Sequence, residues 1–436
     1  MKKSDIRVLG LALFAMFFGA GNLIFPPAIG NMAGQDWFLA MIGFFITGIG
    51  MPVLGIVGVI KAGGSIKDFG KHVGEKFSIV FGLAVVLILG PFMGVPRTGA
   101  TTFEMGIAPL LPNIPVVLVI GIFFLLTWLL SVKQSSIIDI IGKWLTPVLV
   151  ILLVFIVSMG VINSIGDPIT HSNTAFKDGF TGGYQTMDLF VSIMLGAIIL
   201  KTLISKGYTK QSEFFSITWR AGIIAAIGLG TIYGGLLYLG ATGQTLLADV
   251  TTRPMMTVTL VNAILGNMGS ILLGVCVSFA CLTTSIGITA AASEFIDEIT
   301  PQKIKYNLIV TVSVIVSAMM AMGGVDFIVT IAGPILAIIY PLGIVLVILN
   351  IASDYITYKA CFKWTVIATS LISIPMGISE FGFFKEMIDP MIQALPFSDL
   401  GLPWLIPALF GYVGSYIYFK LQSQNRRNRK RMQPQF

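Results

Sequence analysis

Long stretches without a charged residue recur along the whole chain, and most are of the length that one helical crossing of a membrane requires. The longest of them cover residues 8–35, 37–60, 77–96, 105–132, 144–166, 221–248, 254–293, 306–325, 327–353 and 400–419. A helix needs about 20 residues to cross the hydrocarbon core of a bilayer, whereas a barrel strand needs only about 9–11. Because only helices and closed barrels satisfy the backbone in lipid, this pattern predicts membrane-spanning helices.

Two shorter stretches, 189–200 and 364–379, are extended by polar flanks and bring the expected number of spans to about twelve. The spans are placed at about 7–32, 37–60, 76–103, 114–133, 143–164, 186–204, 219–240, 270–294, 305–323, 327–350, 363–379 and 400–420. The expected fold class is therefore an all-α integral membrane protein. No linker separates soluble domains, so residues 1–421 are expected to form one transmembrane domain, followed by a basic tail at 422–436.

The uncharged run 254–293 is too long for a single crossing, and it is interrupted by Gly266-Asn267-Met268-Gly269. Residues 254–265 are therefore expected to form an external helix that lies over the bundle before span 8. The segments 165–185 and 380–399 are rich in Gly, Asp and Pro and are expected to be external surface loops.

Spans 1 and 6 depart from a regular helical pattern. Span 1 carries Gly19-Ala20-Gly21-Asn22 near its midpoint and Pro26-Pro27 soon after, a combination that unwinds a helix. Span 6 has an unusually short uncharged run. If residues 7–164 and 186–350 are two five-span repeats, the second is inverted, and a broken or short helix opens both repeats, with two extra helices at 363–420. This is typical of a transporter's midplane binding site. The alternative for span 1 is that its glycines only permit close helix packing.

Composition and charge placement sharpen this interpretation. With 56% hydrophobic and 11% charged residues, the chain has too much apolar surface for a soluble core of its size. Of its 27 Lys and Arg residues, the predicted external loops hold Lys177, Arg253 and Lys385, and Arg97 lies within span 3. An excess of Lys and Arg on the other side predicts that both termini are cytoplasmic. The basic tail is expected to lie near anionic lipid, and no nucleic-acid partner is expected.

Enzyme classes find no support in the residues. The two histidines, His72 and His171, lie in predicted loops on opposite sides, so no His-based metal cluster is expected at mid-membrane. The sequence has neither the G-x-x-x-x-G-K-[ST] motif that would bind ATP nor a G-x-S-x-G nucleophile motif. An ion channel, the second class, would need a continuous polar path or repeated filter residues rather than two isolated breaks.

Two polar features fall at the same predicted depth. Beyond the break in span 1, the N-terminal end of a half-helix near Asn22 points N–H groups at an anion such as a carboxylate. The preceding half-helix offers carbonyl groups around Ala15 and Phe18, and span 8 offers hydroxyl groups at Thr283 and Thr284. Such neutral oxygen ligands suit an alkali cation. The alternative is that Ser and Thr of span 8 bond back to their own helix.

Three stretches resemble the sodium-coupled amino-acid transporters with the five-plus-five inverted-repeat (LeuT-type) fold. Gly19-Ala20-Gly21-Asn22 with Phe25-Pro26 resembles their G-x-G-N…F-P segment. Residues 192–199, SIMLGAII, are similar to S-L-G-F-G-A-I-I, and residues 280–286, ACLTTSI, are similar to A-G-L-T-S-S-I. Over its whole length, including the segment from Gly90-Pro91-Phe92 to Phe103-Glu104 in span 3, the chain looks most like the bacterial branched-chain amino acid:cation symporters (LIVCS).

The resemblance implies ligands for ion and substrate. The implied sodium ligands are the carbonyl groups of Ala15, Phe18 and Ala280 and the hydroxyl groups of Thr283 and Thr284. The implied substrate-binding residues are Gly19, Ala20, Gly21 and Asn22 for the carboxylate, Leu189, Phe190 and Ser192 near the amino group, and Leu195 in the apolar pocket. Span 7 has no Asn where the relatives use one for a second sodium ion, so a second ion is not expected and Asn22 has no assured ligand role.

Arg97 and Glu104 are seven residues apart on nearly one face of span 3. An ionisable residue in a span is a functional candidate, so they are a possible outer gate, together with Asp326 at the start of span 10. The alternative is a structural pair near the interface.

The expected function is import of leucine, isoleucine or valine with sodium, in a bacterial plasma membrane. Coupling to protons is the closest alternative. It requires a titratable group at the site, and the midplane candidates contain none.

Overall fold

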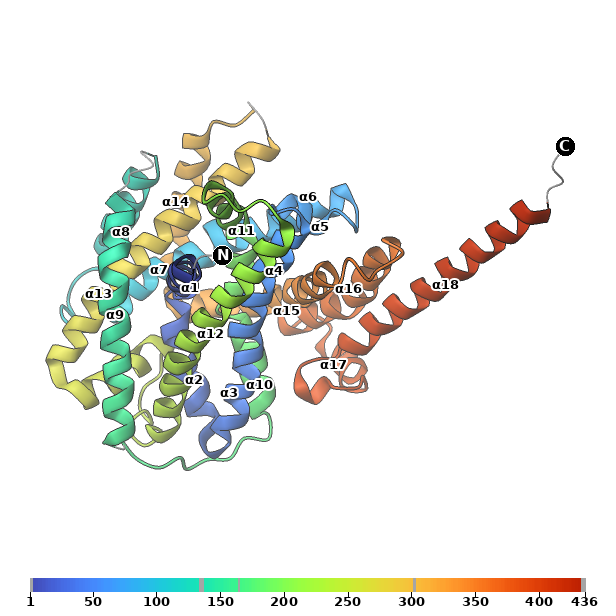
Figure 1. The fold of residues 1–436 in the computed structure, drawn as a ribbon. Helices are drawn as coiled ribbons and strands as arrows, with labels where there is room; N and C mark the ends of the chain where they lie inside the picture. Colours follow the sequence, from blue (N-terminus) through green and yellow to red (C-terminus); the bar gives the residue numbers. More distant parts are fainter. Residues whose placement is uncertain (1–2, 133–136, 164, 301–302, 433–436) are drawn as a thin grey trace.

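The computed structural model describes residues 3–132, 137–163, 165–300 and 303–432, and every regular element in these ranges is a helix (Figure 1). The prediction of an all-α chain is thereby confirmed for the described residues. Small parts of the predictions fall outside these ranges: residue 133 of span 4, residue 164 of span 5 and residues 433–436 of the basic tail.

The first five predicted spans correspond to a series of helices, several of them interrupted. The elements are α1 (Lys3–Phe17), α2 (Gly21–Ala33), η1 (Gly34–Asp36), α3 (Trp37–Phe45), η2 (Ile46–Gly50), α4 (Met51–Ala62), α5 (Ile66–Gly70), α6 (Glu75–Leu87), η3 (Ile88–Phe92), α7 (Gly94–Thr101), η4 (Thr102–Ile107), α8 (Val116–Val132) and α9 (Ile137–Ile162). Span 1 is broken between α1 and α2, where the sequence places Gly19 and Gly21.

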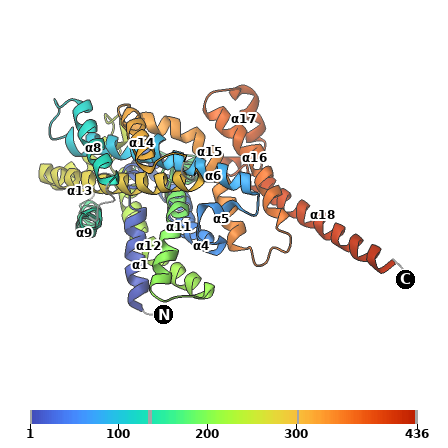
Figure 2. The same cartoon turned by 90° about the horizontal axis from the view of Figure 1, so that it is seen from above.

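The rest of the chain is equally helical. The elements are α10 (Ala175–Tyr184), α11 (Asp188–Ser205), α12 (Gln211–Thr242), α13 (Arg253–Ile299), α14 (Tyr306–Ala321), α15 (Gly324–Ile351), α16 (Ala360–Glu380), α17 (Lys385–Gln393), η5 (Ser398–Leu400) and α18 (Leu405–Met432). Helices α16 to α18 lie together at one side of the bundle, and the end of α18 extends away from it in both views (Figures 1 and 2).

The number of crossings stays a prediction. By length and composition, seven helical segments of the described residues are long and apolar enough to cross a membrane, and three shorter apolar helices accompany them. The seven include Gly21–Ala62, Glu75–Ile107 and Ala175–Ser205, each of which runs through an interruption.

Contacts between distant segments define two faces of the bundle. On one face Lys206 pairs with Asp5 at 3.0 Å, and Gln211 donates to the carbonyl of Lys61 at 3.4 Å. We call this the inner face; it carries the N-terminus. On the opposite face, the outer face, His171 lies 3.1 Å from Asp36. All the residues of the first set lie in segments predicted to be cytoplasmic, and those of the second in segments predicted to be external.

One prediction about span 6 is wrong. The segment 165–185 was expected to be a surface loop, but its residues Ala175–Tyr184 form helix α10, which packs along α3. Three glycines and two charged residues give this segment the composition of a loop, yet its small residues form the buried face of a helix. Span 6 is therefore a broken helix, α10 and α11, joined by a turn in which Met187 has a left-handed φ of 60°.

Glycines let the outer halves of both broken helices pack very closely. A methyl group on Gly30 of α2 would lie 1.8 Å from the carbonyl oxygen of Leu237 in α12. One on Gly179 of α10 would lie 1.9 Å from the carbonyl oxygen of Ala40 in α3. We call these two contacts, α2 with α12 and α3 with α10, the outer seams.

Helix α13 is interrupted where the sequence predicts it. Gly266 has φ 66° and ψ −167°, so residues 253–265 form a separate helical segment before the long remainder of α13. Thr257 in this first segment donates to the carbonyl of Leu23 in α2 at 2.8 Å. The segment thus covers the outer half of span 1.

Candidate functional site at the two helix breaks

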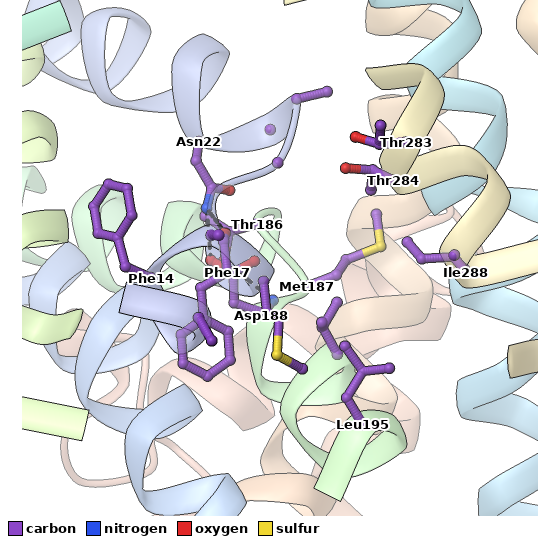
Figure 3. Close-up of a pocket in the computed structure, with 18 of the residues that line it drawn as sticks. Phe14, Phe17, Asn22, Thr186, Met187, Asp188, Leu195, Thr283, Thr284 and Ile288 are labelled. Carbon is purple, nitrogen blue, oxygen red and sulfur yellow. Dashed lines mark hydrogen bonds between the residues drawn. The ribbon is translucent and has the colours of Figure 1, made fainter. Parts of the chain in front are cut away.

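A cavity of about 1030 Å³ lies between the breaks of spans 1 and 6. The break residues Gly19, Ala20, Gly21 and Asn22 line it on one side, and the start of α11 lines it on another (Figure 3). From there its lining continues along α1, α9, α11, α12 and α13. Because residues such as Val8 and Ile198 line this part, the cavity runs from the breaks toward the inner face.

Asn22 joins the two breaks. Its Nδ2 donates to the carbonyl of Phe17 at the end of α1 and to the hydroxyl of Tyr233 in α12. It also donates to Oδ2 of Asp188 at 2.9 Å (Figure 3). Asn22, Tyr233 and Asp188 are all buried, and the last of them is the first residue of α11. One amide therefore ties the end of one half-helix to the start of another, 166 residues later in the chain.

Arg97 of α7 holds the turn of span 6. Its guanidinium donates to the carbonyl of Gln185 at 2.5 Å and to that of Thr186 at 3.4 Å. The guanidinium also lies over the ring of Phe25, 5.4 Å from its centroid, and a methyl on Gly21 would be only 2.8 Å from it. Arg97 is 5% exposed and lines the cavity, so it belongs to the centre of the site.

The residues of the possible outer gate separate into two places. Glu104 accepts a hydrogen bond at 2.8 Å from the backbone N–H of Val325, at the start of α15. Asp326 pairs with Arg253, at the start of the helical segment that covers α2. Glu104 and Asp326 thus lie together at the outer end of α15, while Arg97 contacts the turn of span 6.

The five residues of the implied sodium site lie around the break of span 1. Ala15, Thr283 and Thr284 line the large cavity, and Phe18 and Ala280 line a much smaller one next to it, which shares Gly19 and Ala20. Figure 3 places the two threonines across the cavity from Asn22. Thr283 Oγ1 donates to the carbonyl of Ala280 at 3.0 Å, so a cation bound to both oxygens would replace this bond. Carbonyl and hydroxyl oxygens are suitable ligands for sodium.

The structure divides the implied substrate-binding residues. Gly19 to Asn22 and Leu195 line the cavity, but the lining from span 6 otherwise consists of Thr186, Met187, Asp188, Val191 and Ile198. Leu189 and Phe190 are fully buried and face Gly343 of α15, and Ser192 donates to the carbonyl of Leu189 at 2.6 Å beside Gly55. Met187, the break residue with left-handed φ, precedes these three positions by two to five residues, and their side chains face α4 or α15 instead of the cavity.

Asp188 and Tyr233 are the site residues that sequence reasoning missed. In the sequence Asp188 directly precedes the uncharged run 189–200, where it has the character of a polar flank, whereas the structure places the helix break just before it. A signal was present: Asp188 is a lone acidic residue where a broken helix begins. Tyr233 offers no such local signal, since its partner Asn22 is 211 residues away.

Comparison with known proteins gives a consistent result. A family model described as "Branched-chain amino acid transport protein" matches residues 2–422. The branched-chain amino acid permease BraB of Bacillus subtilis (strain 168) is 34% identical, with 95% of each chain covered. The permease BrnQ of the same organism is 35% identical, with 95% of this chain and 96% of BrnQ covered.

Solved structures show the same fold at low sequence identity. One described as the inward facing conformation of Mhp1 has a TM-score of 0.63 at 14% identity, covering 99% of this chain and 95% of Mhp1. Another, MhsT in complex with L-phenylalanine, has a TM-score of 0.55 at 17% identity, covering 86% of this chain and 97% of MhsT. These neighbours confirm the expected LeuT-like fold.

Proposed function

The chain belongs to the family of branched-chain amino acid transport proteins, and we propose that it imports leucine, isoleucine or valine across the bacterial plasma membrane together with sodium. The family membership supports the substrate class, since the curated relatives are branched-chain permeases. The observation that carries the proposal is the cavity at the two helix breaks, with the start of α2 on one wall and the Thr283 and Thr284 hydroxyls on another.

The substrate's carboxylate binds at the start of α2. The first N–H groups of a helix have no partner within it, and the helix dipole favours an anion there. Gly21 is the first residue of α2 and lines the cavity, whereas the N–H groups of the next two residues donate to the carbonyls of Gly19 and Ala20 at 3.2 and 3.3 Å. The branched side chain then extends toward Val191, Leu195 and Ile288, which supply apolar surface in the same cavity.

Sodium binds between Ala15 and Phe18 of span 1 and Ala280, Thr283 and Thr284 of α13. A cation held by both helices stabilises one arrangement of the break, and the substrate stabilises the same arrangement, so each raises the affinity for the other. With the inner face cytoplasmic, as the positive charges predict, the cavity faces the side to which substrate is released. The close contacts of the outer seams lie on the opposite side.

Proton coupling is a second candidate, and Asp188 is the observation that favours it. The sequence favours sodium over protons in part because the midplane candidates contain no titratable group. Asp188 is a buried carboxylate that lines the cavity, so this reason no longer holds. The hydroxyl and carbonyl oxygens of the sodium candidates remain as the argument for sodium, since a proton carrier has no need of them.

Uptake of labelled amino acids into proteoliposomes of the purified protein tests the proposal. Sodium and pH gradients are imposed separately, against a panel of amino acids. Saturable uptake of leucine, isoleucine and valine driven by the sodium gradient alone is the expected result. Uptake driven by the pH gradient alone would show that protons, not sodium, are the coupling ion. Flux that does not saturate would indicate a channel.

A further inference from the structure

Asp188 is a buried carboxylate with unused hydrogen-bonding capacity. It is 3% exposed and lines the cavity. Its Oδ2 accepts a hydrogen bond from Asn22, and its backbone N–H donates to the hydroxyl of Thr186 at 3.4 Å. No ion pair between described residues includes Asp188. An ionised carboxylate offers about four lone-pair sites, so this one can accept further donors.

The nearby arginine does not fill that capacity. Arg97 gives its hydrogen bonds to the carbonyl groups of Gln185 and Thr186, and it acts on Asp188 through space. No hydrogen bond or ion pair between described residues joins the two side chains. Each remains available to an opposite charge on a bound molecule.

A second acceptor lies beside Asp188. The Oδ1 atom of Asn22 is buried and has no hydrogen-bond partner among the described residues. Nδ2 of the same amide donates to the Asp188 carboxylate, so the Oδ1 atom of Asn22 lies close to that carboxylate. A carboxylate next to an amide oxygen forms a pair of acceptors, and an ammonium group, with three N–H donors and a positive charge, matches such a pair.

The position of this pair fits an amino acid bound at α2. A carboxylate at the first N–H groups of α2 lies next to Gly21, against which the guanidinium of Arg97 also packs. In an α-amino acid the ammonium group is separated from the carboxylate by a single carbon. Asn22 is the next residue of α2 and holds Asp188, so the two acceptors are on the side that the ammonium group would reach (Figure 3).

We propose that Asp188 binds the ammonium group of the substrate, while Arg97 provides a fixed positive charge near its carboxylate, so that the cavity selects zwitterions. This rests on the proposed function and adds the residues that recognise the backbone of the amino acid. A carboxylic acid without the amino group would leave Asp188 unpaired in the cavity. A buried charge that loses its partner destabilises a complex strongly.

The test compares three ligands by the concentration at which each stabilises the purified full-length protein against heat. The ligands are leucine, 4-methylpentanoate, which lacks the amino group, and leucinamide, which lacks the carboxylate. We expect the wild type to bind leucine at least about 100-fold more tightly than 4-methylpentanoate, given the cost of an unpaired buried charge. Asp188→Asn should reduce this ratio by about tenfold or more, by weakening leucine and leucinamide but not 4-methylpentanoate.

The controls separate recognition from folding. Asp249→Asn, in an exposed loop, is the matched change and should leave the ratio as in the wild type. Asp188→Glu keeps the charge and should keep most of the ratio even if leucine binds more weakly, which provides a test if Asp188→Asn does not unfold cooperatively. If Asp188→Asn leaves the ratio of leucine to 4-methylpentanoate affinity unchanged, or if Asp188→Glu abolishes it, the proposed role of Asp188 is wrong while the proposed function still stands. A wild type that none of leucine, isoleucine and valine stabilises overturns the proposed function as well.

Discussion

The two halves of each broken helix are packed in opposite ways. The outer halves, α2 and α10, press backbone against backbone at the outer seams, where Gly30 and Gly179 leave no room for a methyl group. The inner halves, α1 and α11, line the cavity instead, with residues such as Ala12, Leu195 and Ile198. Within one helix, therefore, the break separates a tightly packed half from a half that borders open space.

This difference shows how the chain can be closed at one face and open at the other. Glycine contacts act over a short range, so a separation of only about 0.5–1 Å already loses about a quarter to a half of their dispersion energy. A wall of apolar side chains can close over a ligand gradually by changing rotamers. In the proposed transport cycle, the outer seams are the contacts that an opening to the other side would have to break.

The largest effect is expected where the inner half of span 1 faces α13. Thr283→Ala combined with Thr284→Ala removes the two hydroxyl groups proposed as sodium ligands, each worth about 1.5–3 kcal/mol if it contacts a charge. Sodium-dependent leucine uptake in proteoliposomes should fall by about 100-fold or more, with unchanged protein in the membrane. Undiminished sodium-dependent uptake would remove α13 from the ion site.

The next effect tests the outer seams. Gly30→Ala places a methyl group against the Leu237 carbonyl and should destabilise the state described here by about 1–3 kcal/mol, as overpacking does. Leucine uptake should then fall by about tenfold. Gly121→Ala on α8, where a methyl would meet nothing within 4 Å, is the matched control and should change uptake by less than about twofold. Equal uptake by the two variants would show that the seam does not control transport.

A smaller effect is expected on the rate at which single engineered cysteines react with a thiol reagent. A cysteine at Ile198, in the cavity lining, should react with a membrane-impermeant maleimide added at the inner face, and one at Ile29 on α2, which is 5% exposed, should not. The three native cysteines are buried, which keeps the background low. Leucine with sodium should slow labelling of the first variant by about fivefold, by occupying the cavity or closing it. Equal reactivity of the two cysteines would contradict the difference between the cavity-lining inner halves and the closely packed outer halves of the broken helices.

The smallest effect concerns Glu104. It accepts a hydrogen bond from the start of α15, so Glu104→Gln, which keeps an acceptor oxygen, should lower stability by only about 1 kcal/mol. Leucine uptake should change by less than about twofold, measured together with the unfolding temperature. A tenfold loss of uptake without a change in stability would restore Glu104 as part of a gate.

The sequence was sufficient for features that depend on local pattern. Charge-free runs located the helices, the glycines and prolines of span 1 located its break, and Gly266 marked the interruption of α13. The sequence was not sufficient where a helix depends on packing against a distant segment. Helix α10 has the composition of a loop, and its glycines are explained only by its close packing along α3. The contact of Arg97 with Gln185 spans 88 residues, so no local pattern could connect them.

The opposite charges that Arg97 and Asp188 can carry would have an electrical consequence in the proposed transport cycle. With both side chains ionised, the empty cavity carries no net charge, and a zwitterionic substrate adds none. Moving one elementary charge through a potential of 100 mV is worth about 2.3 kcal/mol, so in the proposed sodium-coupled cycle the voltage would act chiefly on the step that carries the cation. The loaded half of the cycle would then be electrogenic and the return of the empty carrier would be silent to voltage.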